Sequence, residues 1–435
     1  MNIRTTLALG AALAALGCGV AHAQAPAAPE PNYAAQASAG GATDVTVTPR
    51  ADGGVLIGGR LEGRQFAIAV PKAWNHQSLL FAHGYSTPDS AVEVSQDPVA
   101  KDPSLGLLAA AYGEGYAVGH SAYDKAGLGV EAGAKATLRL QLLLGALGAR
   151  RAFVGGGSMG GSIVVTLIEQ HPDTFAGAIS ACGVDSDWQD EIGGVIDMRA
   201  LYSWFTRGTP YALPGDQDLA RSAVPTRPPA GSTTPLATFQ LQQTIKLASP
   251  IVKLFADAQR APEGPAAAIV RKIASVSGAA PEPGSFLFPI ITAAEGMDDI
   301  RATTGGSIYS NRGKHYAGSA LTAAETEALN RDIQRLDADE AAVRYVRRWH
   351  TSSGVFHTPL VAIHNQIDSL VPYSQALGLE AKVAAHGDPH RFALITVPPL
   401  RIPIPGTGVS GYAHCGFDPK QLADAWATLK RMTGE

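Results

Sequence analysis

The sequence predicts an α/β protein in which a mostly parallel sheet, flanked by helices, is interrupted by a mainly helical insertion after Cys182 and before Pro359. Strand-like and helix-like runs alternate from Ser78 to Cys182, and such alternation builds parallel sheets through right-handed crossovers. The same alternation resumes at Pro359, after a long stretch of different character. One α/β domain in two segments explains this pattern better than two tandem domains, because the sheet would otherwise be cut short on one side.

The chain begins with a composition that is typical of an export signal. Residues 1–23 combine a positive start, an apolar run too short to span a bilayer, and small residues at a cleavage position. They are predicted to be a cleaved signal peptide, followed by a linker over residues 24–43. A lipoprotein signal through Cys18 is the weaker alternative. We expect export to the periplasm or the outside of the cell, and no later stretch is long and apolar enough to span a membrane.

The overall composition excludes several classes of protein. The 435 residues are 46% hydrophobic and 17% charged, which is too apolar for a disordered chain. The 34 basic and 38 acidic residues give a formal net charge of −4, so no nucleic-acid partner is expected. The composition leaves the oligomeric state open.

Residues 44–185 are predicted to form the first segment of the α/β domain. Three β-type runs separated by Gly-rich turns predict an antiparallel meander, and the continuous apolar run Ser78–Ala82 is typical of a strand buried on both faces. Leucines at helical spacing predict a helix over Val130–Leu147. In order, the segment is predicted to contain strands at 44–48, 54–57, 65–70 and 78–82, a helix at 105–113, a strand at 116–122, a helix at 130–147, a strand at 152–154, a helix at 158–170 and a strand at 175–182.

Residues 186–345 are predicted to be the insertion, because they are mostly helix-like, contain Pro/Gly breaks and carry several aromatic side chains. Residues 346–435 are predicted to form the second segment of the α/β domain. Its elements are expected to be a strand at 360–363, a helix at 374–385, a strand at 391–397 and a helix at 419–432.

One glycine-rich turn carries a candidate nucleophile. The run Gly156-Gly157-Ser158-Met159-Gly160 matches G-x-S-x-G, between a predicted strand and a predicted helix. In this context a serine stands on a strained turn with its hydroxyl exposed, and the glycines let the strand and helix backbones approach closely. The alternative is a glycine-rich helix start that caps the helix or binds an anion.

A serine hydroxyl needs a base, and the base needs an acid that holds its tautomer. His414 lies in the loop between the last strand and the last helix, where a base over the carboxyl edge of the sheet is expected. Asp368 closely follows the predicted strand at 360–363 and is the preferred acid. Asp185 and Asp187, just past the preceding strand, are the competing acids.

Two backbone N–H groups are needed to bind the oxyanion of a tetrahedral intermediate. The first is expected from Met159, which follows the candidate nucleophile. The second is expected from Tyr85, since Gly84 allows the loop after Ser78–Ala82 to turn its amides inward. The Tyr85 ring is a further candidate for lining a substrate pocket.

After removal of the signal, only Cys182 and Cys415 remain. In an oxidising compartment two cysteines either form one disulfide or stay as free buried thiols, and composition leaves both possibilities open.

Taken together, these motifs resemble the α/β-hydrolase superfamily, and more closely its exported bacterial serine esterases with a large cap insertion. The matching runs are WNHQSLLFAHGY, GYAVGHSAYDKAG, GGGSMGG, HNQIDSLVP and GYAHCGF, which cover nearly all of the α/β core between residues 74 and 417. Ser158, Asp368 and His414 also follow the chain order of that arrangement. Secreted tannase and feruloyl esterase relatives place one cysteine before the nucleophile and another after the histidine. Here Gly157 replaces the first, so the resemblance leaves Cys182 as the partner for Cys415, in a bond that would tether the histidine loop.

The resemblance implies an α/β-hydrolase fold and hydrolysis of carboxylic esters through an acyl-serine, with no metal and no organic cofactor. We expect a small-molecule or polymeric ester as substrate, bulky or aromatic because the insertion is rich in aromatic residues. Three alternatives stay open: a serine peptidase of the same fold, an acyltransferase, and a catalytically silent binding protein.

Overall fold

The computed structural model describes residues 31–404 and 408–435, so the predicted signal peptide lies outside the described residues. Within those ranges nine strands form one sheet in the order β1-β2-β3-β5-β4-β6-β7-β8-β9. The first three strands and β5 pair in antiparallel fashion, and the strands from β5 to β9 are parallel. The strands are β1 Ala42–Pro49, β2 Val55–Leu61, β3 Arg64–Val70, β4 Gln77–Ala82, β5 Ala117–Ser121, β6 Arg151–Gly157, β7 Gly177–Ala181, β8 Leu360–Asn365 and β9 Phe392–Val397. The predicted meander followed by a parallel sheet is confirmed.

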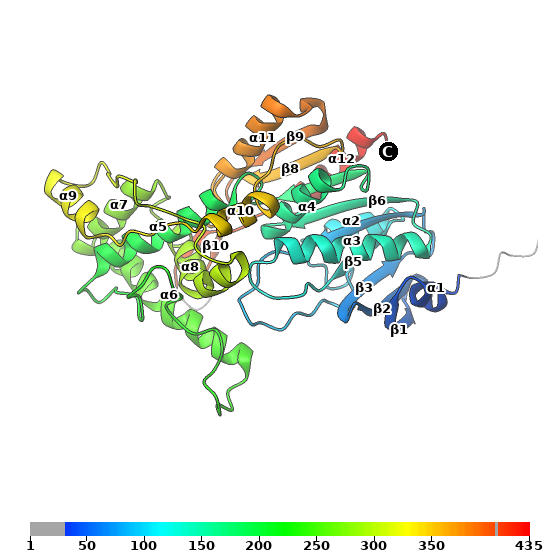
Figure 1. Cartoon of the computed structure of the whole chain (residues 1–435), viewed down its shortest axis with the longest axis horizontal. Helices are drawn as coiled ribbons and strands as arrows, with labels where there is room; N and C mark the ends of the chain where they lie inside the picture. Colours follow the sequence, from blue (N-terminus) through cyan, green and yellow to red (C-terminus); the bar gives the residue numbers. More distant parts are fainter. Residues whose placement is uncertain (1–30, 405–407) are drawn as a thin grey trace, which may run out of the picture. The chain divides into compact units, whose positions relative to one another are not determined.

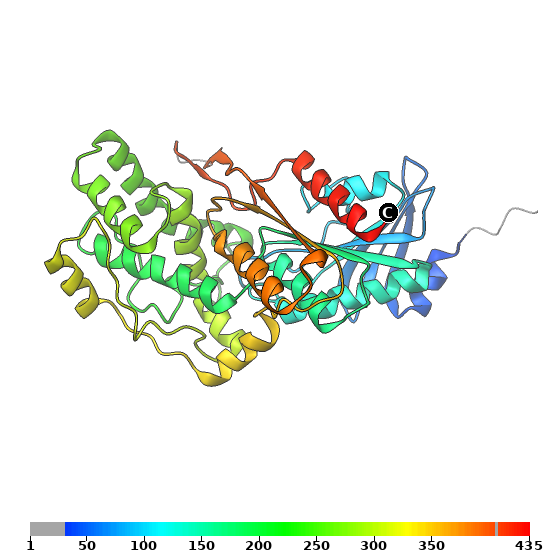
Figure 2. The same ribbon diagram turned by 90° about the horizontal axis from the view of Figure 1, so that it is seen from above.

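Helices cover both faces of this sheet (Figures 1 and 2). On one face α2 Leu107–Gly113 packs beside α12 Pro419–Thr433, and both contact the parallel strands. The other face carries α3 Val130–Leu147, α4 Met159–Gln170 and α11 Ser374–His386. The central strands are therefore buried on both faces, which explains why β4 and β8 read as continuous apolar runs.

The linker predicted for residues 24–43 is wrong for its later part. Tyr33–Ala39 forms helix α1, which packs against β1 and α3, and β1 already begins at Ala42. The physical reason is close packing by small side chains. Ala37 is fully buried, and a Cβ on Gly40 would lie 2.9 Å from the Leu143 side chain.

The segment between β7 and β8 is helical, as predicted. It contains α5 Trp188–Thr206, α6 Leu236–Arg260, α7 Pro265–Ser277, α8 Gly284–Thr304, α9 Ala323–Asp332 and α10 Glu340–Trp349. These helices are drawn in green to yellow in Figure 1, beyond the carboxyl ends of the parallel strands. Inside the insertion the buried Arg199 guanidinium pairs with Asp216 at 2.6 Å and also donates to backbone carbonyls, so its charge is well compensated.

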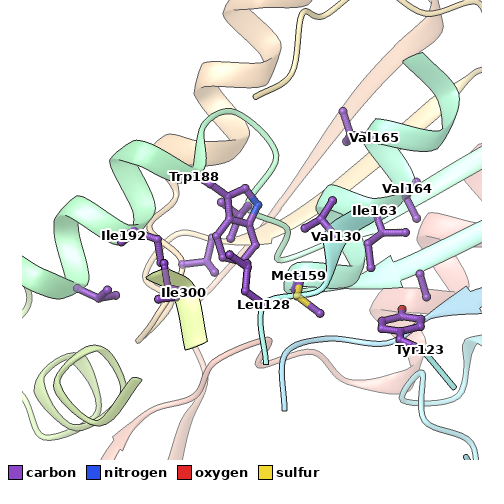
Figure 3. Close-up of a cluster of buried hydrophobic side chains, with 14 of the residues drawn as sticks. Tyr123, Leu128, Val130, Met159, Ile163, Val164, Val165, Trp188, Ile192 and Ile300 are labelled. Carbon is purple, nitrogen blue, oxygen red and sulfur yellow. The ribbon is translucent and has the colours of Figure 1, made fainter. Parts of the chain in front are cut away.

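An apolar cluster joins the insertion to the α/β domain (Figure 3). Trp188 and Ile192 of α5 and Ile300 of α8 are buried in the same core as Leu128 and Met159. Burying a large apolar side chain stabilises the fold by roughly 1.5–3 kcal/mol. The insertion is therefore anchored next to the turn that carries Ser158.

Two short strands lie between β9 and α12, and a 3-10 turn lies just before β9. The 3-10 turn Pro389–Arg391 precedes β9, and strands β10 Arg401–Pro403 and β11 Ser410–Tyr412 form a small separate sheet that the sequence did not predict. Among the described residues, no helix has both the length and the apolar character needed to cross a membrane.

Candidate active site

Ser158 stands on the tight turn between β6 and α4. Its backbone has φ 57° and ψ −124°, a conformation that costs a residue with a side chain of the order of 1–3 kcal/mol. The turn persists because its neighbours hold it. The Ser158 N–H donates to the Ala181 carbonyl at 2.9 Å, and a Cβ on Gly160 would lie only 2.0 Å from the Ala82 carbonyl oxygen. Gly160 is therefore needed because the backbone of β4 comes too close for a side chain at this position. The strained conformation of Ser158 directs its hydroxyl group away from the end of the sheet.

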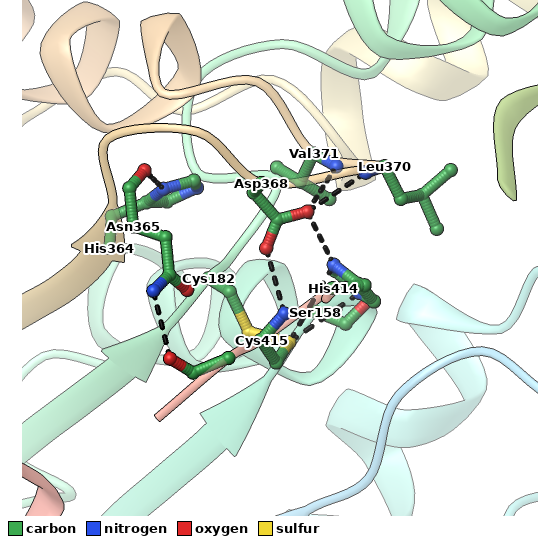
Figure 4. A network of polar contacts seen from close by, with 10 residues as sticks. Ser158, Cys182, His364, Asn365, Asp368, Leu370, Val371, His414 and Cys415 are labelled. Atoms are coloured by element: carbon green, nitrogen blue, oxygen red, sulfur yellow. Dashed lines mark hydrogen bonds and ion pairs between the residues drawn. A yellow bond between two sulfur atoms is a disulfide. The ribbon is translucent and has the colours of Figure 1, made fainter. Parts of the chain in front are cut away.

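The structure brings Ser158, His414 and Asp368 together from three separate loops (Figure 4). His414 Nε2 lies 2.8 Å from Ser158 Oγ, and His414 Nδ1 lies 2.7 Å from Asp368 Oδ1. An ionised carboxylate only accepts hydrogen bonds, so Nδ1 carries the proton and donates it to Asp368. Nε2 is then free to accept the hydrogen bond of the Ser158 hydroxyl. This is the arrangement that a histidine base requires.

Asp368 is held as a buried anion. Its side chain is fully buried, and its oxygens accept hydrogen bonds from the backbone N–H groups of Leu370, Val371 and Cys415 at 2.8–3.0 Å. Burial works to raise the pKa of Asp368, but the charge and hydrogen bond of His414 and the backbone donors outweigh it, so the pKa lies below its ordinary value. Asp368 therefore stays ionised at neutral pH and can stabilise an imidazolium.

The competing acids have other partners. Asp185 accepts a hydrogen bond from Ser180 Oγ at 2.6 Å, and burial raises its pKa to about 6. Asp187 caps α5 by accepting from the Gln189 N–H at 2.7 Å. Neither makes a hydrogen bond to His414, so the geometry favours Asp368 over both.

The two predicted oxyanion donors lie on either side of the serine. Met159 is the first residue of α4, where a helix leaves its N–H groups without intrahelical acceptors. Across the site, a Cβ on Gly84 would lie 3.3 Å from Ser158 Cβ, which brings the loop after β4 against the nucleophile. Within the described residues neither the Met159 nor the Tyr85 N–H donates to a protein acceptor. Both donors are therefore available to a substrate oxygen.

Cys182 and Cys415 are bonded to each other, with Cα atoms 5.3 Å apart. The bond links the end of β7 to the residue that follows His414. The same loop is also held by Asn365, whose side-chain amide donates to the Gly416 carbonyl at 2.9 Å. The Cys182, Cys415, Asp368 and His414 donor atoms lie within 4.8 Å of one another, but the sulfurs are engaged in the disulfide and the carboxylate in hydrogen bonds. This cluster is a tethered histidine loop rather than a set of free metal ligands.

Two cavities open beside Ser158. The larger one measures about 380 Å³ and is mostly apolar; Ser158, His414, Leu105 and Phe417 are among its lining residues. The smaller one, of about 40 Å³, lies under α5 and α8, and Ser158, Tyr85, Trp188 and Glu191 are among its lining residues. Tyr85 thus lines both cavities.

A further hollow of about 500 Å³, between α5, the start of α8 and the loop after β8, touches Asp368 but not Ser158. Sequence reasoning missed the α5 and α8 residues of the smaller cavity, because nothing in the local pattern of the insertion indicates which helix face meets the serine.

No curated protein matches the sequence. Among solved structures, the chain is similar to a ligand-bound form of the rice cell wall degrading esterase LipA from Xanthomonas oryzae, with 14% identity over 82% of this chain and 91% of that one, and a TM-score of 0.40. It is also similar to a putative hydrolase from Legionella pneumophila, with 13% identity, coverage of 89% and 87%, and a TM-score of 0.41. A third is the monoacylglycerol lipase of Paleococcus ferrophilus, with 14% identity, coverage of 82% and 93%, and a TM-score of 0.35.

A family model described as the alpha/beta hydrolase fold matches residues 137–393, which is more than half of the chain. The match spans the Ser158 turn, the helical insertion and the Asp368 loop. The chain belongs to the alpha/beta hydrolase fold family.

Proposed function

We propose that this protein is a serine hydrolase that cleaves carboxylic esters through an acyl-serine intermediate. The observation that carries the proposal is the unbroken chain of hydrogen bonds from Ser158 Oγ through His414 to the buried Asp368. It stands at the mouth of a cavity and beside two free backbone donors, which is the set of groups that acyl transfer requires.

In the proposed reaction the Ser158 oxygen attacks the ester carbonyl carbon while His414 Nε2 takes the hydroxyl proton. The carbonyl oxygen becomes an oxyanion that the Met159 and Tyr85 N–H groups bind, and each such donor is worth roughly 10²–10³ in rate. His414 then gives the proton to the leaving alcohol as the carbon–oxygen bond breaks. Water repeats the sequence against the acyl-serine and releases the acid, and Asp368 holds the imidazole in one tautomer throughout.

The cavities suggest how the substrate is oriented. His414 must reach the leaving oxygen, and His414 lines only the larger cavity. We therefore propose that the alcohol portion occupies the larger cavity, whose lining includes Phe81, Leu105 and Phe417. A bulky or aromatic alcohol would bury the most apolar surface there.

We further propose that the protein is exported. The Cys182–Cys415 bond supports this, since disulfides persist mainly in oxidising compartments. Fractionation of cells that express the full chain, with N-terminal sequencing of the mature protein, tests both export and cleavage after residue 23.

The function itself is tested with a panel of esters and amides of the same acid. We expect phenyl and naphthyl esters to be hydrolysed faster than the ethyl ester, and the matching anilide to be hydrolysed slowest. Ser158→Ala should abolish turnover and labelling by a fluorophosphonate probe. Ser249→Ala, which removes a hydroxyl from an exposed position on α6, should change neither.

Three results would overturn the proposal, and each would point to a different alternative function or mechanism. Ester turnover that survives Ser158→Ala removes the serine mechanism. An anilide hydrolysed faster than the esters makes the protein a peptidase. Wild-type protein that neither labels nor turns over any substrate favours a silent binding protein.

A further inference from the structure

Two residues that line the smaller cavity each carry a buried polar atom without a partner. Among the described residues, Glu191 Oε2 and Tyr85 Oη are both shielded from solvent and make no hydrogen bond. Both residues line the 40 Å³ cavity next to Ser158. A buried polar atom without a partner costs roughly 1–3 kcal/mol, so two of them at one cavity point to a group that is present only when substrate is bound.

Glu191 is held in place by the first turn of α5. The helix begins after the Asp187 cap, and the neighbouring Trp188 donates from its indole nitrogen to Ser162 Oγ of α4 at 2.8 Å. Glu191 itself is only 5% exposed. It lines the small cavity together with Ser158 and the 500 Å³ hollow together with Asp368.

Tyr85 lines the same cavity, and its hydroxyl lies against α8. It projects toward α8 at Gly296, where a Cβ would lie 2.8 Å from the hydroxyl oxygen. The absence of a side chain on Gly296 leaves the hydroxyl room without supplying a partner. The backbone N–H of Tyr85 is the proposed second oxyanion donor, so this hydroxyl belongs to a residue that would also contact the reacting carbonyl group.

The rest of the lining is almost entirely apolar. Leu128, Trp188, Ile192 and Ile300 line the cavity and pack together in Figure 3. No Lys, Arg or His is among its lining residues, and the nearby Lys125 is paired with Asp299 at 2.6 Å. Burial and, after it, the negative charge of Asp368 raise the pKa of Glu191 well above its ordinary value. Burial therefore favours the neutral, protonated form of this carboxyl group, and a neutral ligand group suits that form better than an ammonium group.

We propose that Glu191 and the Tyr85 hydroxyl form a subsite that binds a hydroxyl group on the acyl portion of the substrate. A hydroxyl both donates and accepts, so one such group satisfies both side chains. The acyl portion is the one that fits, since His414 does not line this cavity and the leaving alcohol must lie near His414. A cavity of about 40 Å³ holds only a few atoms, which indicates a short hydroxy acid. The inference rests on the proposed ester hydrolysis and specifies its substrate class.

The test compares three esters of one phenol: the butyrate, the 3-hydroxybutyrate and the 3-aminobutyrate. For the wild type we expect kcat/KM for the hydroxy ester to exceed that for the butyrate by roughly ten- to a hundredfold. In Glu191→Leu and in Tyr85→Phe this ratio should fall toward one. Tyr85→Phe keeps the backbone donor, so it remains informative even where Glu191→Leu disturbs the fold.

Asp190→Asn is the matched control. It removes an exposed carboxylate from the same turn of α5, at a residue that lines the large hollow but not the small cavity. Its hydroxy-to-deoxy ratio should equal that of the wild type. Thermal unfolding of every variant separates a lost subsite from a lost fold.

The outcomes distinguish the subsite from the function. A wild type that hydrolyses butyrate and hydroxybutyrate equally well, by a reaction that Ser158→Ala abolishes, removes the subsite and leaves the esterase. A preference for the amino ester overturns the hydroxyl in favour of a cation. A ratio that is unchanged in both variants also overturns the assignment, and no turnover of any ester overturns the proposed function instead.

Discussion

Removing the disulfide between Cys182 and Cys415 is expected to destabilise the protein and to loosen the loop that carries His414. The bond joins residues that are 233 apart in sequence. In the chain-entropy model, a loop of that length stabilises the native state by about 5 kcal/mol at 25 °C, at the upper end of what disulfides contribute. For a chain of this size, that free energy corresponds to a fall of about 6 °C in the unfolding midpoint.

The effect on activity is expected to be smaller, because the loop has other anchors. The Cys415 N–H still donates to Asp368 and Asn365 still holds Gly416. We expect kcat to fall roughly tenfold with little change in KM, since even a small displacement of a catalytic group is costly.

Thermal unfolding and steady-state kinetics of the wild type, with and without a reductant, measure both effects. The double variant Cys182→Ala/Cys415→Ala should have a midpoint equal to or below that of the reduced wild type and should not respond to reductant. Reduction without substitution isolates the cross-link from the loss of buried side-chain volume. The reasoning is refuted if complete reduction, verified by mass spectrometry, leaves both the midpoint and kcat unchanged.

Three further predictions concern the site and its surroundings. Asp368→Asn should lower kcat by about 10³–10⁴-fold, since the amide no longer stabilises the His414 imidazolium or enforces its tautomer; a loss below tenfold in ester kinetics would contradict this role. Gly84→Ala places a methyl group 3.3 Å from Ser158 Cβ and should lower kcat about tenfold, with the unfolding midpoint held within 2 °C as the control for folding. Asp185 has a pKa raised to about 6, so the native state loses stability as pH rises from about 4 to 6 and keeps that penalty above pH 6. Asp185→Asn should therefore be more stable than the wild type at pH 7.5, by about 3 kcal/mol, and equal to it near pH 4; denaturant titrations that show the same difference at both pH values would refute the assignment.

Much of the fold is readable from local patterns. The sequence shows the strand patterns of β3, β4 and β8, the leucine spacing of α3 and the turn at Ser158. These features can be predicted because side-chain periodicity and the positions of glycines depend on the backbone geometry of a few neighbouring residues. Element boundaries differ from the predicted ones by only a few residues. Helix α1 was missed because its alanine-rich segment has no amphipathic pattern, and its burial depends on α3, about a hundred residues later.

The candidate site was likewise predicted in part from the sequence and completed by the tertiary structure. Chemistry singled out Ser158, His414 and Asp368 as candidates, but Asp185 and Asp187 remained open because their positions along the chain were equally suitable. Contacts between segments settled which acid meets His414, since Asp185 lies against Ser180 while Asp368 lies 2.7 Å from the imidazole.

By itself, then, the sequence determined the alternation of strands and helices, the helical insertion and the residue types able to perform acyl transfer. These features depend on local backbone preferences and on the chemistry of single side chains. Only the tertiary structure decided that β4 lies between β5 and β6, that Cys182 bonds to Cys415, and that Glu191 and Tyr85 line one cavity beside Ser158. Each of these pairs residues far apart in the chain. Such pairings depend on how the whole core packs, and no local pattern records them.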